Sequence, residues 1–168
     1  MSRSVDPATG GTISMTASLR FTLDTNILVY AANRDAGVLH RKAQVVVRRA
    51  ADSGCVLLLQ ALTEFFRVAV AKSGLAVREA ERIVNAWRDV FPVHCADERV
   101  LVDAMDAVAA HKLAFWDAML WATARRAGCR VVLSEDFQDG RELGGVVFLN
   151  PFAANASPLL IDVLGVGP

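Results

Sequence analysis

The sequence predicts one α/β domain in which a parallel sheet of about five strands is flanked by helices on both faces. Short apolar runs alternate along the chain with longer segments whose apolar residues recur at helical spacing. The length of 168 residues, with 54% hydrophobic and 21% charged residues, is typical of a single globular domain with a sizeable core. This alternation of strands and helices favours parallel strands, because each helix returns the chain to the same edge of the sheet.

Five short apolar segments are predicted to be strands. The first shows alternating Phe21 and Leu23 and ends on Asp24. The second is apolar at every position, as expected for a parallel strand that is covered on both faces. In chain order the predicted strands are 19–23, 55–59, 91–93, 130–133 and 145–149.

The segments between these strands are predicted to be helices, because their apolar residues recur three and four positions apart. Asp97 is a suitable N-cap, and the pairs Ser53-Gly54 and Ser73-Gly74 are typical helix ends. The predicted helical segments are 27–32, 39–51, 61–72, 77–87, 98–108 and 117–127. The predicted order is therefore β-α-α-β-α-α-β-α-α-β-β.

The two ends of the chain carry weaker patterns. Residues 1–19 are rich in Gly, Ser, Thr and Ala and lack the continuous apolar stretch of a secretion signal, so we expect a flexible N-terminal extension. Residues 154–168 form a loosely specified tail, which leaves 20–153 as the folded domain. Glycine and proline interrupt the uncharged segment 143–161, so it is not expected to span a membrane.

Charge and cysteine content narrow the class of protein. Eighteen Lys and Arg balance eighteen Asp and Glu, so any contact with nucleic acid must come from a local patch, and an architectural DNA-binding role is disfavoured. Arg67 and Lys72 are candidates to line a groove. The cysteines have no CxxC spacing and are predicted to be buried free thiols in a cytoplasmic protein; they are Cys55, Cys95 and Cys129.

Acidic residues follow two of the predicted strands. Asp24 comes directly after the first strand, and Asp136 lies in the loop that follows the strand 130–133. Ligands of open α/β sheets bind outside the carboxyl ends of the strands, so both side chains are expected at one crevice. The alternatives are that Asp24 only caps a helix and that Asp136 is a solvated loop acid.

Two further acids lie in apolar surroundings on predicted helices. Glu64 is flanked by Leu62 and Phe65, where an unpaired charge would be costly to bury, unless Arg67 is its partner. Asp117 begins a helix between large apolar residues, where the helix dipole favours negative charge, although a first-turn acid needs no other role.

Four carboxylates at one crevice would repel one another and hold raised pKa values unless a cation neutralised them. Oxygen ligands of this kind suit Mg²⁺ or Mn²⁺. Such a cation activates water and stabilises negative charge on a phosphoryl group, which is the chemistry of phosphodiester hydrolysis. Asp24, Glu64, Asp117 and Asp136 are therefore predicted to form one catalytic metal site.

From about residue 21 to residue 152, the chain resembles the PIN domain family, and within it the VapC-type toxins of bacterial toxin–antitoxin pairs. The resemblance depends on the order and spacing of four short motifs, which are 23–28, 63–65, 115–118 and 133–136. It implies a PIN-like nuclease domain over 20–153 and a Mg²⁺- or Mn²⁺-dependent endoribonuclease.

The resemblance also implies roles for particular residues and partners. The acids matching Asp24, Glu64, Asp117 and Asp136 hold the metal. Thr25, Asn26 and Ser134 support the site by hydrogen bonding, and Asp139 shares or replaces the role of Asp136. The implied partners are an RNA substrate, a VapB-like antitoxin that inserts a peptide into the groove, and a second copy of the chain in a homodimer.

Two other functions are disfavoured by the sequence. A phosphatase of the haloacid dehalogenase kind needs a second acid two residues after the first aspartate, where this chain has Asn26. A receiver-like module needs a lysine after a strand that the sequence does not provide. A catalytically inactive PIN-like interaction module is the remaining alternative, and core or dimer packing is the favoured role of Trp87, Trp116 and Trp121.

Overall fold

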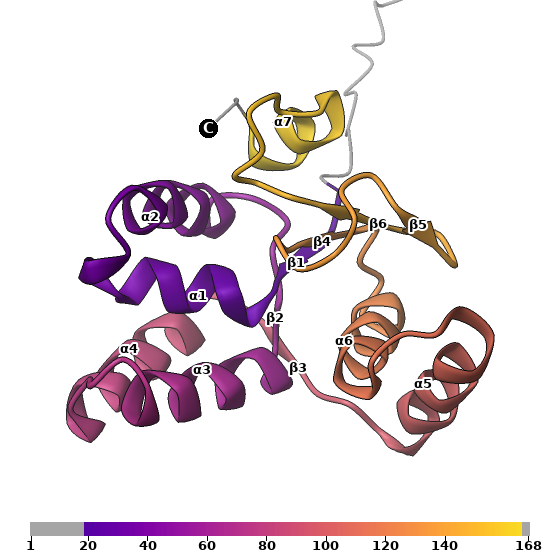
Figure 1. Cartoon of the computed structure of the whole chain (residues 1–168), viewed down its shortest axis with the longest axis horizontal. Coiled ribbons are helices and arrows are strands. Elements are labelled where there is room, and N and C mark those ends of the chain that lie inside the picture. Colours follow the sequence, from indigo (N-terminus) through magenta and orange to yellow (C-terminus); the bar gives the residue numbers. More distant parts are fainter. Residues whose placement is uncertain (1–18, 166–168) are drawn as a thin grey trace, which may run out of the picture.

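A computed structural model describes residues 19–165, which form a mostly parallel sheet flanked by helices on both faces (Figure 1). This confirms the predicted fold class. The strands are β1 (Phe21–Leu23), β2 (Leu57–Leu58), β3 (Val93–His94), β4 (Val131–Leu133), β5 (Glu142–Leu143) and β6 (Val146–Leu149). The helices are α1 (Thr25–Ala32), η1 (a 3-10 turn, Arg34–Ala36), α2 (Val38–Ala51), α3 (Leu59–Ala71), α4 (Val77–Val90), α5 (Glu98–His111), α6 (Phe115–Arg126) and α7 (Pro158–Leu164).

The main sheet has four strands in the order β1-β4-β6-β5, close to the five or so that were predicted. β4 is parallel to both β1 and β6, and only β5 is antiparallel. The short parallel pair β2-β3 lies beside β1, to which one bridge between Phe21 and Cys55 joins it. The Val56 N–H donates to the Phe21 carbonyl at 2.9 Å across this seam. The parallel strands therefore present their carboxyl ends at one edge.

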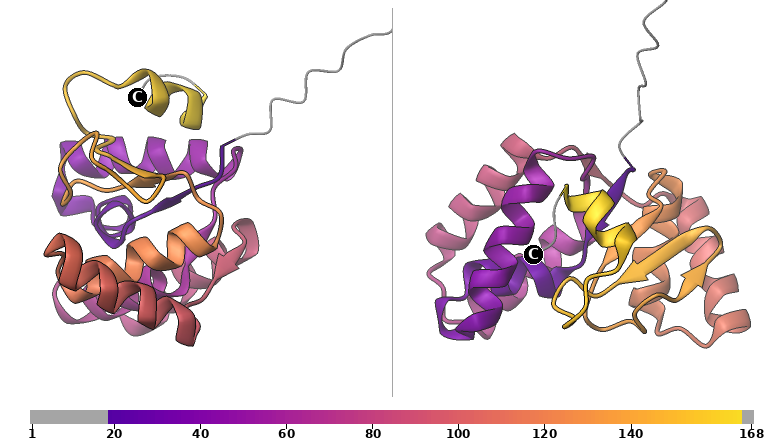
Figure 2. Two further views of the ribbon diagram at one scale, coloured as in Figure 1. Left: turned by 90° about the vertical axis from the view of Figure 1, so that its right-hand side faces the viewer. Right: turned by 90° about the horizontal axis from the view of Figure 1, so that it is seen from above.

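Residues of the strands alternate between two apolar cores, as the period of two in a strand requires. Val131 and Leu133 of β4 join a core with α1, α2, α3, α4 and α7, whereas Val132 joins a second core with α5 and α6. Figure 2 shows α2 and α7 on one side of the sheet and α5 and α6 on the other. The strands β1, β2 and β4 are buried at every residue, which explains their nearly continuous apolar sequence.

The predicted order of elements is confirmed, with three additions. These are the turn η1, the two-residue strand β5 and the helix α7, which the sequence patterns did not predict. The predicted strand 55–59 is shorter than expected, because α3 already begins at Leu59, whose side chain is 46% exposed. Asp97 caps α5 as predicted, since its carboxylate accepts from the N–H groups of Arg99 and Val100.

Two expectations about the ends and the cysteines are modified. Of the N-terminal extension predicted over 1–19, residues 1–18 lie outside the described residues. Cys55 and Cys129 are buried free thiols, but Cys95 is exposed, because it lies in the loop before α5 instead of in a strand. Within residues 19–165, no helix is long and apolar enough to cross a membrane.

Candidate active site

The carboxyl edge of the sheet places Asp24 and Ser134 side by side. Asp24 follows β1, and its N–H donates to the Leu133 carbonyl at 2.9 Å. Ser134 follows β4, and its N–H donates to the Leu149 carbonyl at 3.0 Å. These bonds continue the parallel ladders by one residue, so both side chains are fixed by the sheet itself.

Asp24 is the most buried acid of the site. It caps α1, since its Oδ1 accepts from the Thr25 N–H at 2.6 Å, and its Oδ2 accepts from the Ser134 hydroxyl at 2.6 Å. Burial raises the pKa of Asp24 from its ordinary 3.8 to about 6, although these two hydrogen bonds lower it; the carboxylates of Asp136 and Asp117 raise it further. The cap that was the alternative reading is present, but it uses only one carboxylate oxygen.

Asn26 connects this group to Asp136. Its Nδ2 donates to Asp136 Oδ2 at 2.9 Å and to Ser134 Oγ at 3.2 Å, with Asp24 Oδ2 at 3.5 Å. The Ser134 hydroxyl also accepts from the Asp136 N–H at 3.1 Å. One amide and one hydroxyl therefore hold two carboxylates of the same sign close together.

Glu64 reaches the site from α3. Its Oε2 accepts from the Thr25 hydroxyl at 2.9 Å, which links α3 to the first residue of α1. Among the salt bridges between described residues none involves Glu64, so Arg67 is not the partner that the sequence allowed. The half-buried carboxylate keeps its second oxygen for another ligand.

Asp117 faces these acids from the opposite group of helices, in the first turn of α6. Ala114 is the N-cap residue of α6, and Asp117 is an acid of the first turn, as the alternative reading allowed. Burial raises the pKa of Asp117, and the charges of Asp136 and Glu64 raise it further. These charges act on Asp117 because the four acids line one cavity.

That cavity has a volume of about 310 Å³ and opens at the carboxyl edge of the sheet. Its described lining holds four carboxylates and no Lys or Arg; the lining residues are Asp24, Thr25, Asn26, Val29, Tyr30, Gln60, Glu64, Val68, Trp116, Asp117, Leu120 and Asp136. Arg67, Lys72 and Asp139 are absent from this lining. Asp139 instead accepts from the Asn150 N–H at 2.8 Å, which fixes the loop after β4.

The donor set fits a hard divalent cation, since it consists of carboxylate oxygens with raised pKa values at Asp24 and Asp117. No three acidic, histidine or cysteine side chains within residues 19–165 are close enough together to hold one ion. Mg²⁺ tolerates this, because it commonly binds one or two carboxylates and keeps several waters. The residues present therefore fit Mg²⁺ or Mn²⁺ held in part by water.

Three further residues of the cavity were not predicted. Tyr30 donates its hydroxyl proton to Glu135, and this hydrogen bond is the main cause that raises the pKa of Tyr30 to about 12. The Gln60 amide donates to the Trp116 carbonyl at 3.0 Å. The only sequence signal was the position of Trp116 directly before Asp117, because the other contacts join segments far apart in the chain.

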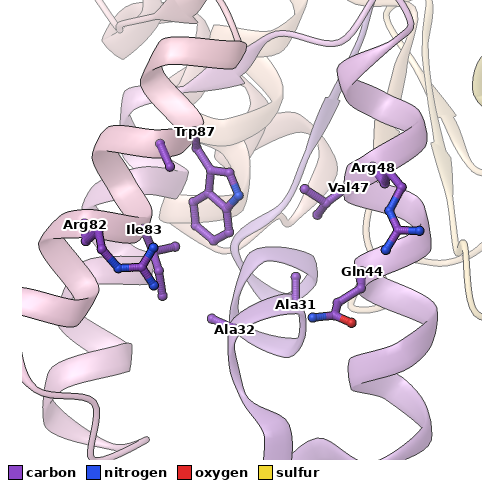
Figure 3. A pocket seen from close by; sticks show the side chains of 9 residues that line it. Ala31, Ala32, Gln44, Val47, Arg48, Arg82, Ile83 and Trp87 are labelled. Atoms are coloured by element: carbon purple, nitrogen blue, oxygen red, sulfur yellow. The ribbon is translucent and has the colours of Figure 1, made fainter.

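A second hollow, of about 320 Å³, lies between α1, α2 and α4 (Figure 3). Its walls are mainly apolar, with Arg48 and Arg82 at its edge; the other lining residues are Ala31, Ala32, Gln44, Val47, Ile83, Ala86 and Trp87. Arg82 also pairs with Glu79 at 2.7 Å. This hollow is separate from the acidic cavity, with which it shares no lining residue.

The fold and the acidic cavity define a parallel α/β protein with a carboxylate site at the edge of its sheet. The family model of the PIN domain matches residues 21–138, so the chain belongs to the PIN domain family. This confirms the family that the sequence motifs indicated. No match was found among curated protein sequences.

Solved structures of low sequence identity have the same fold. VapC20 of Mycobacterium tuberculosis, described as a sarcin–ricin loop cleaving toxin, is 21% identical with a TM-score of 0.53, over 67% of this chain and 86% of that chain. A toxin–antitoxin complex from Klebsiella pneumoniae is 19% identical with a TM-score of 0.54, over 75% and 94%. DNA-bound VapBC from Salmonella typhimurium is 18% identical with a TM-score of 0.56, over 77% and 96%.

Proposed function

We propose that this protein is a Mg²⁺- or Mn²⁺-dependent endoribonuclease, the toxin of a VapBC-type toxin–antitoxin pair. The observation that carries the proposal is a cavity lined by Asp24, Glu64, Asp117 and Asp136 without a basic side chain among the described residues. Such a cavity favours a bound cation, because carboxylates that lie close together repel one another. Membership of the PIN domain family and the toxins among the structural neighbours support the same function.

The environments of the four carboxylates differ. Asp24 and Asp117 carry raised pKa values and would hold the cation, which when bound supplies the positive charge that acidifies water and neutralises the scissile phosphate. Glu64 and Asp136 each keep one oxygen away from their hydrogen bonds to Thr25 and Asn26. These oxygens would complete the ligands of the cation, directly or through its bound water.

Cleavage of a fluorescent RNA by purified protein with Mn²⁺ or Mg²⁺ tests this function. Asp24→Asn and Asp117→Asn should each lower the rate on the order of 100-fold, because each removes a charge that the cation needs. EDTA should abolish cleavage. Asp139→Asn is the matched control, since Asp139 lies outside the cavity and an amide oxygen can still accept from the Asn150 N–H.

Rates that survive both Asn substitutions in the cavity would refute the metal-nuclease function. If the unchanged protein cleaves no RNA in either metal, the catalytically inactive interaction module becomes the better reading. A fall in rate for Asp139→Asn equal to that for Asp24→Asn would instead assign the fourth acid to Asp139.

The hollow between α1, α2 and α4 supports an antitoxin as the partner. Its apolar walls suit apolar side chains of a peptide, and Arg48 at its edge suits an acidic one. Complexes among the structural neighbours are toxin–antitoxin pairs. Co-expression with the product of a small adjacent reading frame should give a complex that Val47→Glu disrupts, because the new charge would face the apolar wall.

A further inference from the structure

Trp116 is the most exposed of the large apolar side chains among residues 19–165, with 60% of its surface open to solvent. The other two tryptophans are packed. Trp121 is 6% exposed and donates its indole N–H to the Leu143 carbonyl at 2.9 Å, and Trp87 packs edge-on against Phe65 with ring centroids 4.7 Å apart. The sequence favoured core or dimer packing for all three tryptophans, and core packing does not account for Trp116.

The place of Trp116 in the fold is fixed although its ring is exposed. The Gln60 amide of α3 donates to its carbonyl at 3.0 Å, which ties the start of α6 to α3. Phe115 packs edge-on against the indole with centroids 5.3 Å apart. A fixed backbone with an open aromatic face is typical of a ligand contact, since large exposed apolar groups gain nothing by facing water.

Trp116 lines the same cavity as the four carboxylates and directly precedes Asp117. Their Cα atoms are one peptide apart, about 3.8 Å. A phosphate held at Asp117 through a cation would therefore lie within about one nucleotide of the indole. The group that a nucleic acid brings next to each phosphate is a flat base, and a base stacks on an aromatic face whatever its sequence.

We propose that Trp116 is the stacking residue for an unpaired base adjacent to the scissile phosphate. The proposal rests on the proposed nuclease function, and it requires that the base beside the cleaved bond be unpaired. A base inside a duplex has both faces covered by its neighbours and cannot stack on Trp116 without being extruded. Loops, bulges and strand ends present such a free face.

Stacking on Trp116 stabilises the bound substrate and the transition state equally. Loss of the stacking should therefore raise KM and leave kcat nearly unchanged. Base–aromatic stacking corresponds to a change of roughly 5- to 150-fold in binding. We expect Trp116→Ala to raise KM for a single-stranded RNA about 10-fold and Trp116→Phe to retain most of the wild-type value. Phe66→Ala, an exposed aromatic of α3 outside the cavity, is the matched control and should change neither constant.

A double-mutant cycle that combines Trp116→Ala with abasic RNA tests whether a base stacks on Trp116. The cleaved RNA is resynthesised with one ribose lacking its base, on either side of the cleavage position. At the position that Trp116 contacts, the abasic ribose should raise KM by the same factor as Trp116→Ala, and the two changes together should raise it no further. Removing bases at other positions should leave the effect of Trp116→Ala intact.

Three results would overturn the proposal. The first is an unchanged KM for Trp116→Ala while the wild type cleaves. The second is an equal rise in KM on every abasic RNA. The third is that Trp116→Ala converts a dimer to a monomer in sedimentation and that this conversion accounts for the loss of activity. Trp116 would then be a contact between two copies of the chain. Absence of cleavage by the unchanged protein would contradict the nuclease function itself, which separates the two failures.

Discussion

Burial disfavours the ionised form of the Asp24 side chain. It is 9% exposed, and burial raises its pKa from 3.8 to about 6. The unfolded chain releases this proton near pH 4, whereas the folded protein keeps it until about pH 6. Between these values the folded state binds more protons, so the free energy of unfolding falls as pH rises through this window and is level above it.

The substitution Asp24→Asn should therefore stabilise the metal-free protein at pH 7, by on the order of 1–3 kcal/mol, and should have little effect below pH 4. Urea unfolding at several pH values measures the difference. Addition of Mg²⁺ should reverse the order, because only the wild-type carboxylate gains a cation. A wild type more stable than Asp24→Asn at pH 7 in EDTA would contradict this account.

Ser134 is the buried donor that makes the charge on Asp24 tolerable, and its hydrogen bond lowers the pKa of Asp24. Ser134→Ala should cost about 1–3 kcal/mol of unfolding free energy at pH 7, because a carboxylate oxygen loses its hydroxyl donor. It should also raise the pKa of Asp24, measured by NMR titration. Ser53→Ala removes a hydroxyl bonded to the Arg49 carbonyl, far from the acids, and should leave that pKa unchanged.

At the scale of elements, Tyr30 adds a second tie between α1 and the loop that carries Asp136, beside the hydrogen bonds of Asn26. Tyr30 of α1 donates to Glu135, and its ring packs edge-on against Phe152 with centroids 5.8 Å apart. Glu135 therefore turns away from the cavity toward Tyr30, while Asp136 turns into it. Tyr30 therefore helps to position the loop through Glu135, while Asn26 holds the Asp136 carboxylate directly.

We predict that Tyr30→Phe weakens Mn²⁺ binding about 10-fold, as is typical when a group that orients a metal ligand is removed. Calorimetric titration with Mn²⁺ measures the change. Phe152→Leu removes the ring contact but keeps the tyrosine hydroxyl, so its Mn²⁺ affinity should remain near that of the wild type. Equal losses for the two variants would show that packing, not the hydrogen bond, orients the loop.

Elements with a strong periodic pattern could be predicted from the sequence, whereas very short elements could not. The helices and the strands around Asp24 and Asp136 follow from apolar runs of adequate length, and the strand-end rule then places both acids at one edge. β5 has two residues and forms a hairpin only through Gly144 and Gly145, both with positive φ, so it leaves no periodic signal.

The sequence of α7 contains a helix-start signal, but the residues before it favoured an irregular structure. Ser157 caps it, since its hydroxyl accepts from the Leu160 N–H at 3.1 Å, and Pro158 occupies the first turn. The prolines and asparagines before it favoured an irregular tail. The contacts of Tyr30 and Gln60 were beyond prediction for another reason, because they join positions 105 and 56 residues apart along the chain.

At the scale of the whole molecule, α5 presents an apolar face to solvent. Leu101, Val102 and Met105 are 41%, 52% and 50% exposed, and the spacing of Met105 to the other two places them on neighbouring positions of the helix. A homodimer was expected from the resemblance to VapC-type toxins. We propose this face as the contact surface of such a homodimer, should the chain form one.

Val102→Asp should convert the dimer to a monomer, because a buried, unpaired carboxylate opposes association. Sedimentation velocity measures the change in mass. Val38→Asp is the matched control, since Val38 is 57% exposed at the start of α2. A wild type that sediments as a monomer, or a dimer that survives Val102→Asp, would rule out this surface.

The seam between β1 and β2 has a mechanical consequence for the cavity. One bridge, between Phe21 and Cys55, joins the two parts of the sheet, and the Thr25–Glu64 hydrogen bond spans α1 and α3 above it. Elements joined by few backbone hydrogen bonds open at lower cost than those in long ladders. The acidic cavity therefore lies beside a weakly joined line of the sheet. A cation held by both Glu64 and Asp24 would restrain the seam between β1 and β2. Slower exchange of the Phe21 and Val56 amide hydrogens on addition of the cation would measure this restraint.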